Sequence, residues 1–198
     1  MKTILCFLYE SFVAFEATLA CYYINLETDF QVKYIGYEKT PIKSSGGISV
    51  RIDKTVEEIT STKDIEGIII PGGNDRILKP ELELLIKKLH EDKKMIAAIC
   101  AGPEFLAKCG ILDGRKYTTT VPPSEYVEKK EEDPFPRETY VETRMIRDGN
   151  IITAKIGAFV DFALEIWDFL NLYEYEGERE ESRLMFTPIK RLSPVFKK

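Results

Sequence analysis

One cysteine stands where a buried strand gives way to a helix, a position that suits nucleophilic chemistry. The apolar run Met95–Ile99 leads directly into Cys100-Ala101-Gly102-Pro103. Ligands of open α/β sheets bind at the carboxyl ends of the strands. A helix N-terminus favours thiolate over thiol, and small residues after the cysteine permit a sharp nucleophile elbow. We therefore predict that Cys100 is a reactive thiol with a lowered pKa.

The other three cysteines have no comparable position. Cys6, Cys21 and Cys109 are expected to pack in the core, where free cysteine is common. No C-x-x-C pairing is present, so the cysteines do not indicate a metal site, and neither a metal nor a cofactor is expected. Cys109 lies nine residues after Cys100, at the far end of the next helix, and would be a poor resolving thiol.

A glutamate in the first helix is the expected acid partner of the thiol. Glu16 is the one charged residue between Phe12 and Ile24, and it lies on the apolar stripe of that helix. A buried carboxylate is costly, so the group should be protonated or firmly hydrogen-bonded. Its helix begins near the sheet edge that carries Cys100. The alternative is a glutamate that snorkels to the helix rim.

A glycine turn follows the buried strand Gly67–Ile70. Pro71-Gly72-Gly73-Asn74 allows unusual backbone angles and close approach of a ligand. An amide of this turn and the Ala101 amide could together form an oxyanion hole.

The elements that must position these residues alternate between strand and helix. Such alternation is typical of an α/β fold with a three-layer, doubly wound, mostly parallel sheet and helices on both faces. We expect strands at Thr3–Leu8, Val32–Tyr37, Ile48–Ile52, Gly67–Ile70, Met95–Ile99, Lys116–Thr120, Tyr140–Ile146 and Ile151–Ala154. Helices are expected from Phe12 to Tyr23, from Pro80 to Leu89, from the elbow to Cys109, and from Phe159 to Leu170. Glu128–Asp133 is expected to be a loop or a solvated face.

Bulk composition narrows the class of protein. The 198 residues carry a net charge of -5, which argues against a general nucleic-acid binder. The apolar start is too brief for a secretory signal, and no run reaches the ~18 apolar residues of a membrane span. We expect a cytoplasmic protein with reduced thiols and no membrane partner. The length suits one α/β domain, residues 1–172, with a C-terminal extension, residues 173–198, that packs on it or on a second subunit.

The P-G-G-N turn, the A-I-C-A-G-P elbow and the first-helix glutamate, in this order, resemble the ThiJ/PfpI superfamily. That group has the class I glutamine amidotransferase-like, flavodoxin-like fold, and the resemblance runs from about Lys2 to Leu172. It implies that Cys100 is the reactive cysteine, that Glu16 hydrogen-bonds it, and that Gly73 and Ala101 supply backbone donors. It also implies a homodimer and either glyoxalase III or deglycase chemistry, peptidase-like activity, or a chaperone-like or oxidative-stress role.

Histidine is missing where relatives carry it. Peptidase-like members have histidine after the cysteine, where this chain has Ala101, and glyoxalase-like members often have one at the position of Thr120. The single histidine, His90, ends the helix before Met95–Ile99 and so belongs at the opposite sheet edge, on the surface. A Cys-His peptidase or glutaminase is therefore not expected.

Three functions remain open. The leading hypothesis is a hydrolase or lyase that attacks a small carbonyl or amide compound through Cys100, with Glu16 as proton shuttle. The second is a stress-protective protein whose partner is an oxidant and whose Cys100 is oxidised to sulfinic acid without turnover. The third is a small-molecule binding module that uses the hydroxyls of residues 118–120.

Overall fold

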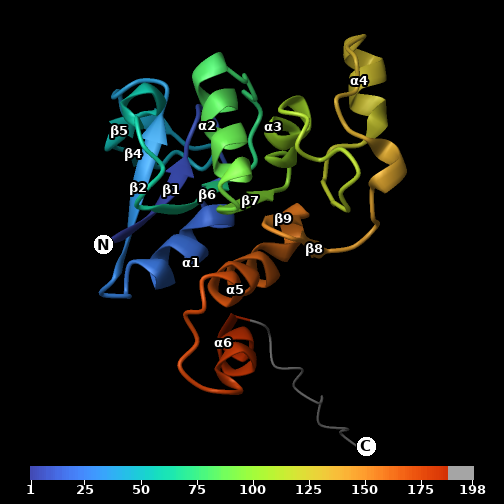
Figure 1. Ribbon diagram of the computed structural model, residues 1–198. Coiled ribbons are helices and arrows are strands. Elements are labelled where there is room, and N and C mark those ends of the chain that lie inside the picture. Colours follow the sequence, from blue (N-terminus) through green and yellow to red (C-terminus); the bar gives the residue numbers. More distant parts are fainter. Residues whose placement is uncertain (187–198) are drawn as a thin grey trace, which may run out of the picture.

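Parallel strand pairing organises the main sheet of the computed structural model, which describes residues 1–186 (Figure 1). Its strand order is β5-β2-β1-β6-β7-β9-β8, parallel except for the β8–β9 pair. The strands are β1 (Lys2–Phe7), β2 (Phe30–Gly36), β5 (Lys54–Thr55), β6 (Ile65–Ile70), β7 (Met95–Ile99), β8 (Met145–Asp148) and β9 (Ile151–Ala154). A separate antiparallel pair is formed by β3 (Ile42–Lys43) and β4 (Ser49–Val50).

Helices cover both faces of this sheet, as the alternating sequence predicted. The helices α1 (Phe15–Ile24) and α5 (Phe159–Phe169) pack together on one face, and α2 (Pro80–Glu91) and α3 (Pro103–Lys108) lie on the other (Figure 1). α4 (Pro123–Lys129) stands at the periphery beyond α3, and α6 (Glu178–Phe186) packs on α5. Short 3-10 turns are η1 (Val56–Glu58), η2 (Arg137–Thr139) and η3 (Ile156–Ala158).

The central strands are buried on both faces, which is why they appear in the sequence as unbroken apolar runs. Every residue of β7 is fully inaccessible to solvent. The Trp167 indole N–H of α5 donates to the Ala20 carbonyl of α1 at 3.3 Å, so the helix pair that covers one face is also tied by a buried hydrogen bond. The predicted doubly wound α/β fold is confirmed.

Two predicted strands are wrong in extent. Lys116–Thr120 forms only an isolated bridge, between Tyr117 and Tyr140, because β7 pairs directly with β9 and leaves no place for a strand between them. The threonines of this segment, residues 118–120, form hydrogen bonds with side chains and with loop backbone instead. The predicted strand Tyr140–Ile146 is displaced: β8, Met145–Asp148, begins five residues later and ends two residues later.

Three further differences are local. Helix α1 begins at Phe15, because Phe12 lies in the turn before it. The predicted edge strand Ile48–Ile52 contributes only β4, in the small separate sheet. Helix α4 was not predicted, and the charged run Glu128–Asp133 begins in its last turn before continuing as a loop.

The described part of the C-terminal extension packs on the domain. Arg179 of α6 reaches Glu165 of α5 at 2.6 Å, and the Tyr23 hydroxyl of α1 lies 3.9 Å from the Met185 sulfur. The rest of the predicted extension, residues 187–198, lies outside the described residues, so the division at residue 172 stays a prediction. Within residues 1–186, no helix is long and apolar enough to cross a membrane.

The elbow after β7 is so tightly packed that a side chain cannot replace Gly102. A Cβ there would lie 2.5 Å from the Ile70 carbonyl oxygen and 2.9 Å from that of Ile99. Both obstacles are backbone, so relief requires β6, β7 and the elbow to shift together.

We predict that Gly102→Ala lowers the free energy of unfolding by about 1–3 kcal/mol through this overpacking. Gly46→Ala is the matched control, because the nearest atom to its added Cβ is the Ser44 hydroxyl at 3.9 Å. Denaturant midpoints of the two variants decide the question, and equal midpoints would contradict the packing argument.

Candidate active site

Cys100 follows β7 immediately and adopts a backbone conformation that side chains normally avoid. Its φ is +62°, in the left-handed region, which costs about 1–3 kcal/mol for a non-glycine residue. Three hydrogen bonds hold it there: its amide donates to the Ala154 carbonyl at 2.8 Å, and its carbonyl accepts from the Thr120 amide and the Thr119 hydroxyl, both at 2.9 Å. The predicted nucleophile elbow is therefore a real strained turn, locked by β9 and by the threonine segment.

Glu16 lies against this thiol, as the sequence predicted, and does not snorkel to the rim. It occupies the first turn of α1 and is 1% exposed. The Gly72 amide donates to its Oε2 at 2.6 Å. A Cβ placed on Gly72 would sit 2.8 Å from both Cys100 Sγ and Glu16 Oε2, so only glycine leaves room for the two groups to meet.

The second carboxyl oxygen of Glu16, Oε1, is buried and has no hydrogen-bond partner among residues 1–186. An unpaired buried carboxylate oxygen is costly, whereas a protonated one carries a donor that can serve a ligand. Burial raises the pKa of Glu16 to about 7, against the opposing effects of the Gly72 amide and Cys100. Glu16 can therefore gain or lose a proton near neutral pH.

The predicted lowered pKa of Cys100 is wrong for this environment. Burial is the largest influence, and together with the Glu16 carboxylate it raises the thiol pKa to about 12, although contacts with Thr120 and the Ala101 amide oppose the rise. A helix N-terminus favours thiolate, but the burial of Cys100 outweighs it. Because the two groups are in contact, they titrate as a pair. From about pH 7 upward the pair carries one negative charge and one proton.

The glycine turn is held by contacts to successive peptide groups. The Tyr9 hydroxyl donates to the Pro71 carbonyl at 3.0 Å, and the Val13 amide donates to the Gly72 carbonyl at 2.9 Å. In a trans peptide the N–H points opposite to the C=O. These contacts therefore direct the Gly72 amide toward Glu16 and fix the direction of the Gly73 amide, which bonds to no protein acceptor within residues 1–186.

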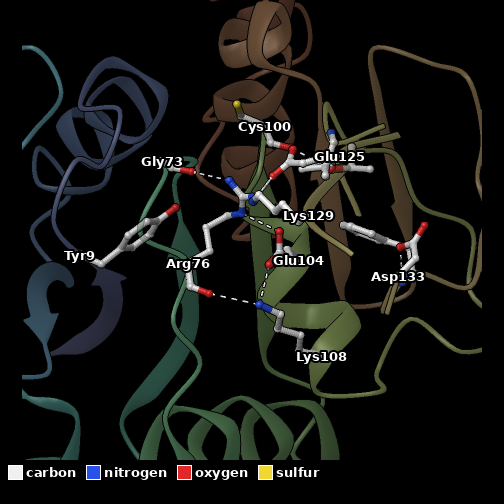
Figure 2. A network of polar contacts seen from close by, with 12 residues as sticks. Tyr9, Gly73, Arg76, Cys100, Glu104, Lys108, Glu125, Lys129 and Asp133 are labelled. Atoms are coloured by element: carbon white, nitrogen blue, oxygen red, sulfur yellow. Dashed lines mark hydrogen bonds and ion pairs between the residues drawn. The ribbon is translucent and has the colours of Figure 1, made fainter. Parts of the chain in front are cut away.

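Sequence reasoning missed two groups here. Gly72 donates its amide to Glu16, a role that the sequence predicted for neither glycine of the P-G-G-N turn. Arg76 lies three residues after Gly73 and is buried among carboxylates, as Figure 2 shows. Nothing in the local sequence distinguishes it from a surface arginine.

A cleft of about 540 Å³ is separated from the Cys100 thiol by the side chain of Thr120. Thr120 both lines this cleft and contacts the Cys100 side chain. The rest of its lining combines apolar, hydroxyl-bearing and charged side chains: Thr119, Val121, Pro122, Pro123, Arg137, Tyr140, Glu142 and Lys155. Its volume suits a small molecule.

His90 takes no part in this site. It lies in the last turn of α2, before β7 begins, whereas Cys100 follows the end of that strand, so the predicted placement at opposite sheet edges is confirmed. It is half-buried instead of exposed at the surface, and its Nδ1 is buried with no partner within the described residues. Burial, followed by the charge of Arg115, lowers the His90 pKa.

A strained cysteine elbow at the strand ends of a doubly wound sheet defines a class of α/β proteins with a nucleophile-elbow architecture. Comparison identifies the family within that class: residues 2–168 match the DJ-1/PfpI family, and the chain belongs to it. The resemblance inferred from the sequence motifs is thereby confirmed.

Relatives and solved structures agree with this assignment. The chain is 26% identical over 132 residues to Deglycase TK1284 of Thermococcus kodakarensis, covering 65% of this chain and 75% of that protein. It is 30% identical over 160 residues to YoaZ of Bacillus subtilis, described as an uncharacterized protease, covering 77% and 72%. The DJ-1 superfamily protein Atu0886 of Agrobacterium tumefaciens superposes with a TM-score of 0.79 at 25% identity, covering 93% and 97%.

We predict that Glu16→Gln stabilises the protein at pH 8 and removes a pH dependence. With its pKa raised to about 7 by burial, Glu16 holds a proton in the native state between about pH 4.3 and 7 that it lacks when unfolded. Stability therefore falls as pH rises through that window, by about 3 kcal/mol in total. Glutamine has no charge to bury and can still accept from Gly72.

Urea unfolding at several pH values from 5 to 8 measures this difference. Glu10→Gln, a change at an exposed carboxylate, is the control. Parallel stability–pH curves for wild type and Glu16→Gln would contradict the assigned pKa.

Proposed function

We propose that this chain is a cysteine-dependent hydrolase or lyase of small carbonyl or amide compounds, similar in chemistry to its deglycase relatives. One observation carries the proposal: a buried carboxyl with a pKa of about 7 lies against the Cys100 thiol, with one oxygen bonded to Gly72 and the other without a partner among residues 1–186. A group of that kind accepts the thiol proton and returns it to the substrate at neutral pH. The match to a named deglycase supports the carbonyl class.

The first step couples bond formation to proton transfer. Cys100 Sγ bonds to the carbonyl carbon, the thiol proton passes to the Glu16 carboxylate, and the carbonyl π electrons become an oxyanion. The free amide of Gly73 and the amide of Ala101 are the proposed donors to that oxyanion. The proton leaves the Cys100 thiol while the sulfur attacks, so the reaction does not require a thiolate to form beforehand. The raised pKa of Cys100 disfavours such a thiolate.

The second step depends on the substrate. With an aldehyde, Glu16 returns its proton to the oxyanion and a hemithioacetal results. With an amide, Glu16 gives the proton to nitrogen, the C–N bond breaks, and an amine leaves. Water then hydrolyses the thioester to a carboxylic acid and restores the Cys100 thiol. The part of the substrate that does not react is proposed to bind in the cleft beside Thr120.

A screen of small aldehydes and amides tests the enzyme. We predict turnover by the wild type and its loss, by at least about 10³-fold, in Cys100→Ser and Glu16→Ala, because nucleophile and proton shuttle act as one unit. Cys109→Ala, at a buried thiol after α3, is the control and keeps its activity within about twofold. Equal rates in wild type and Cys100→Ser would remove Cys100 from the chemistry.

A second function is favoured by the same unpartnered Oε1. A protonated Glu16 could donate to an oxygen added to sulfur, as in a protective, oxidant-responsive protein. Peroxide would oxidise Cys100 to sulfenic acid with loss of water, and a second peroxide would give sulfinic acid with loss of water again. Cys109 cannot intervene as a resolving thiol, because it lies beyond the far end of α3.

For this second function, mild peroxide is predicted to add about 32 Da at Cys100, stably, in wild type. Glu16→Ala is predicted to continue to the irreversible sulfonic acid, about 48 Da in total, because the donor that holds sulfinic acid is gone. Intact-mass spectrometry follows both. Stable sulfinic acid together with no turnover in the substrate screen selects this function over the enzyme, and oxidation spread evenly over all four cysteines would reject it.

A further inference from the structure

A buried arginine connects the glycine turn to the two helices beyond the elbow. The Arg76 side chain is 8% exposed. Its Nε donates to Glu104 Oε2 at 2.6 Å, its Nη2 donates to Glu125 Oε1, and its Nη1 donates to the Gly73 carbonyl at 2.9 Å (Figure 2). All three ends of the guanidinium are thus occupied by different segments of the chain.

Each charge of this cluster is paired with an opposite charge within the protein. Burial disfavours the charged guanidinium, but Glu104 and Glu125 outweigh it and raise the Arg76 pKa. Glu104, 5% exposed, also pairs with Lys108 at 2.6 Å, and Glu125 pairs with Lys129 at 2.7 Å. Removing one of these ions would leave another buried without its partner, which is strongly destabilising. The planar guanidinium of Arg76 therefore fixes the relative positions of the loop after β6, α3 and α4.

The hydrogen bond from Arg76 to the Gly73 carbonyl links this cluster to the proposed chemistry at Cys100. Glycine has no Cβ to restrict its backbone, so its orientation depends on what its peptide groups bind. The Val13 amide holds the carbonyl before Gly73, and Arg76 holds the carbonyl of Gly73 itself. Glu104 lies four residues after Cys100, in the first turn of α3. The arginine therefore fixes Gly73 relative to the helix that begins at the elbow.

We propose that Arg76 is a positioning residue: by binding the Gly73 carbonyl, it holds the turn that carries the Gly73 amide in place beside the elbow, for oxyanion stabilisation at Cys100. The inference rests on the proposed carbonyl chemistry for its consequence in catalysis. Its structural part, the fixed position of the peptide that follows Gly73, holds independently of any substrate. Lysine cannot take the place of arginine here, because a single ammonium cannot serve three acceptors in one plane.

The kinetic test compares Arg76→Lys with the wild type. We expect kcat to fall about 10- to 100-fold with KM within about threefold, as for a misplaced catalytic group. Alkylation of Cys100 by iodoacetamide needs no oxyanion hole and should stay within about twofold. Arg179→Lys is the matched control, because Arg179 also bridges two carboxylates, Glu165 and Asp168, but on α6. An equal loss of turnover and alkylation in Arg76→Lys indicates general disruption and overturns the proposal.

A second measurement needs no activity. The Gly73 carbonyl and the Asn74 N–H belong to the same peptide group. In protein labelled with ¹⁵N-asparagine, the order parameter of the Asn74 amide should fall from a rigid value of about 0.85 to below about 0.6 in Arg76→Lys, while that of Asn150 is unchanged. An unchanged Asn74 amide overturns the proposal. If the wild type turns over no substrate, the proposed function fails, and this readout still decides the role of Arg76. If Arg76→Lys does not fold, Glu125→Gln at the more exposed end of the cluster replaces it, with the same changes, smaller in size.

Discussion

The contact between the buried carboxyl of Glu16 and the thiol of Cys100 is the constraint on which the rest of the site depends. It requires a glycine at position 72, because any side chain would occupy the space where the two groups meet. It requires Glu16 in the first turn of α1, and it raises the pKa values of both groups by burial. Burying the Glu16 carboxyl beside the Cys100 thiol therefore costs stability as the pH rises toward about 7.

Most of the fold follows from sequence patterns. The unbroken apolar runs before Pro71 and Cys100 predict buried parallel strands, and periodic apolar residues predict the covering helices. The threonine segment was not predictable in the same way, because its backbone amides bond to a side chain and to the elbow. Thr118, for example, donates its amide to the Thr153 hydroxyl at 2.9 Å and so needs no partner strand. Helix α4 is short and buries Tyr126 alone, so it leaves no apolar stripe in the sequence.

The residues of the candidate site were likewise only partly predictable from the sequence. Position in the sequence was enough to select Cys100, Glu16 and the glycine turn, because strand ends of a parallel sheet share one edge. The direction of the Cys100 pKa shift was not predictable, since it depends on how deeply the thiol is buried. The ion pairs of Arg76 were not predictable either, because Glu104 and Glu125 come close to it only in the folded chain.

Together these features place a buried thiol, a buried carboxyl with a pKa of about 7 and a glycine turn side by side, with His90 at the other end of β7. A ¹³C NMR titration of the Glu16 side-chain carboxyl, in wild type and Cys100→Ser, tests the central pair most directly. We predict a titration midpoint of about 7 that moves when the thiol is replaced. A midpoint near the ordinary value of about 4.3, indifferent to Cys100→Ser, would contradict it.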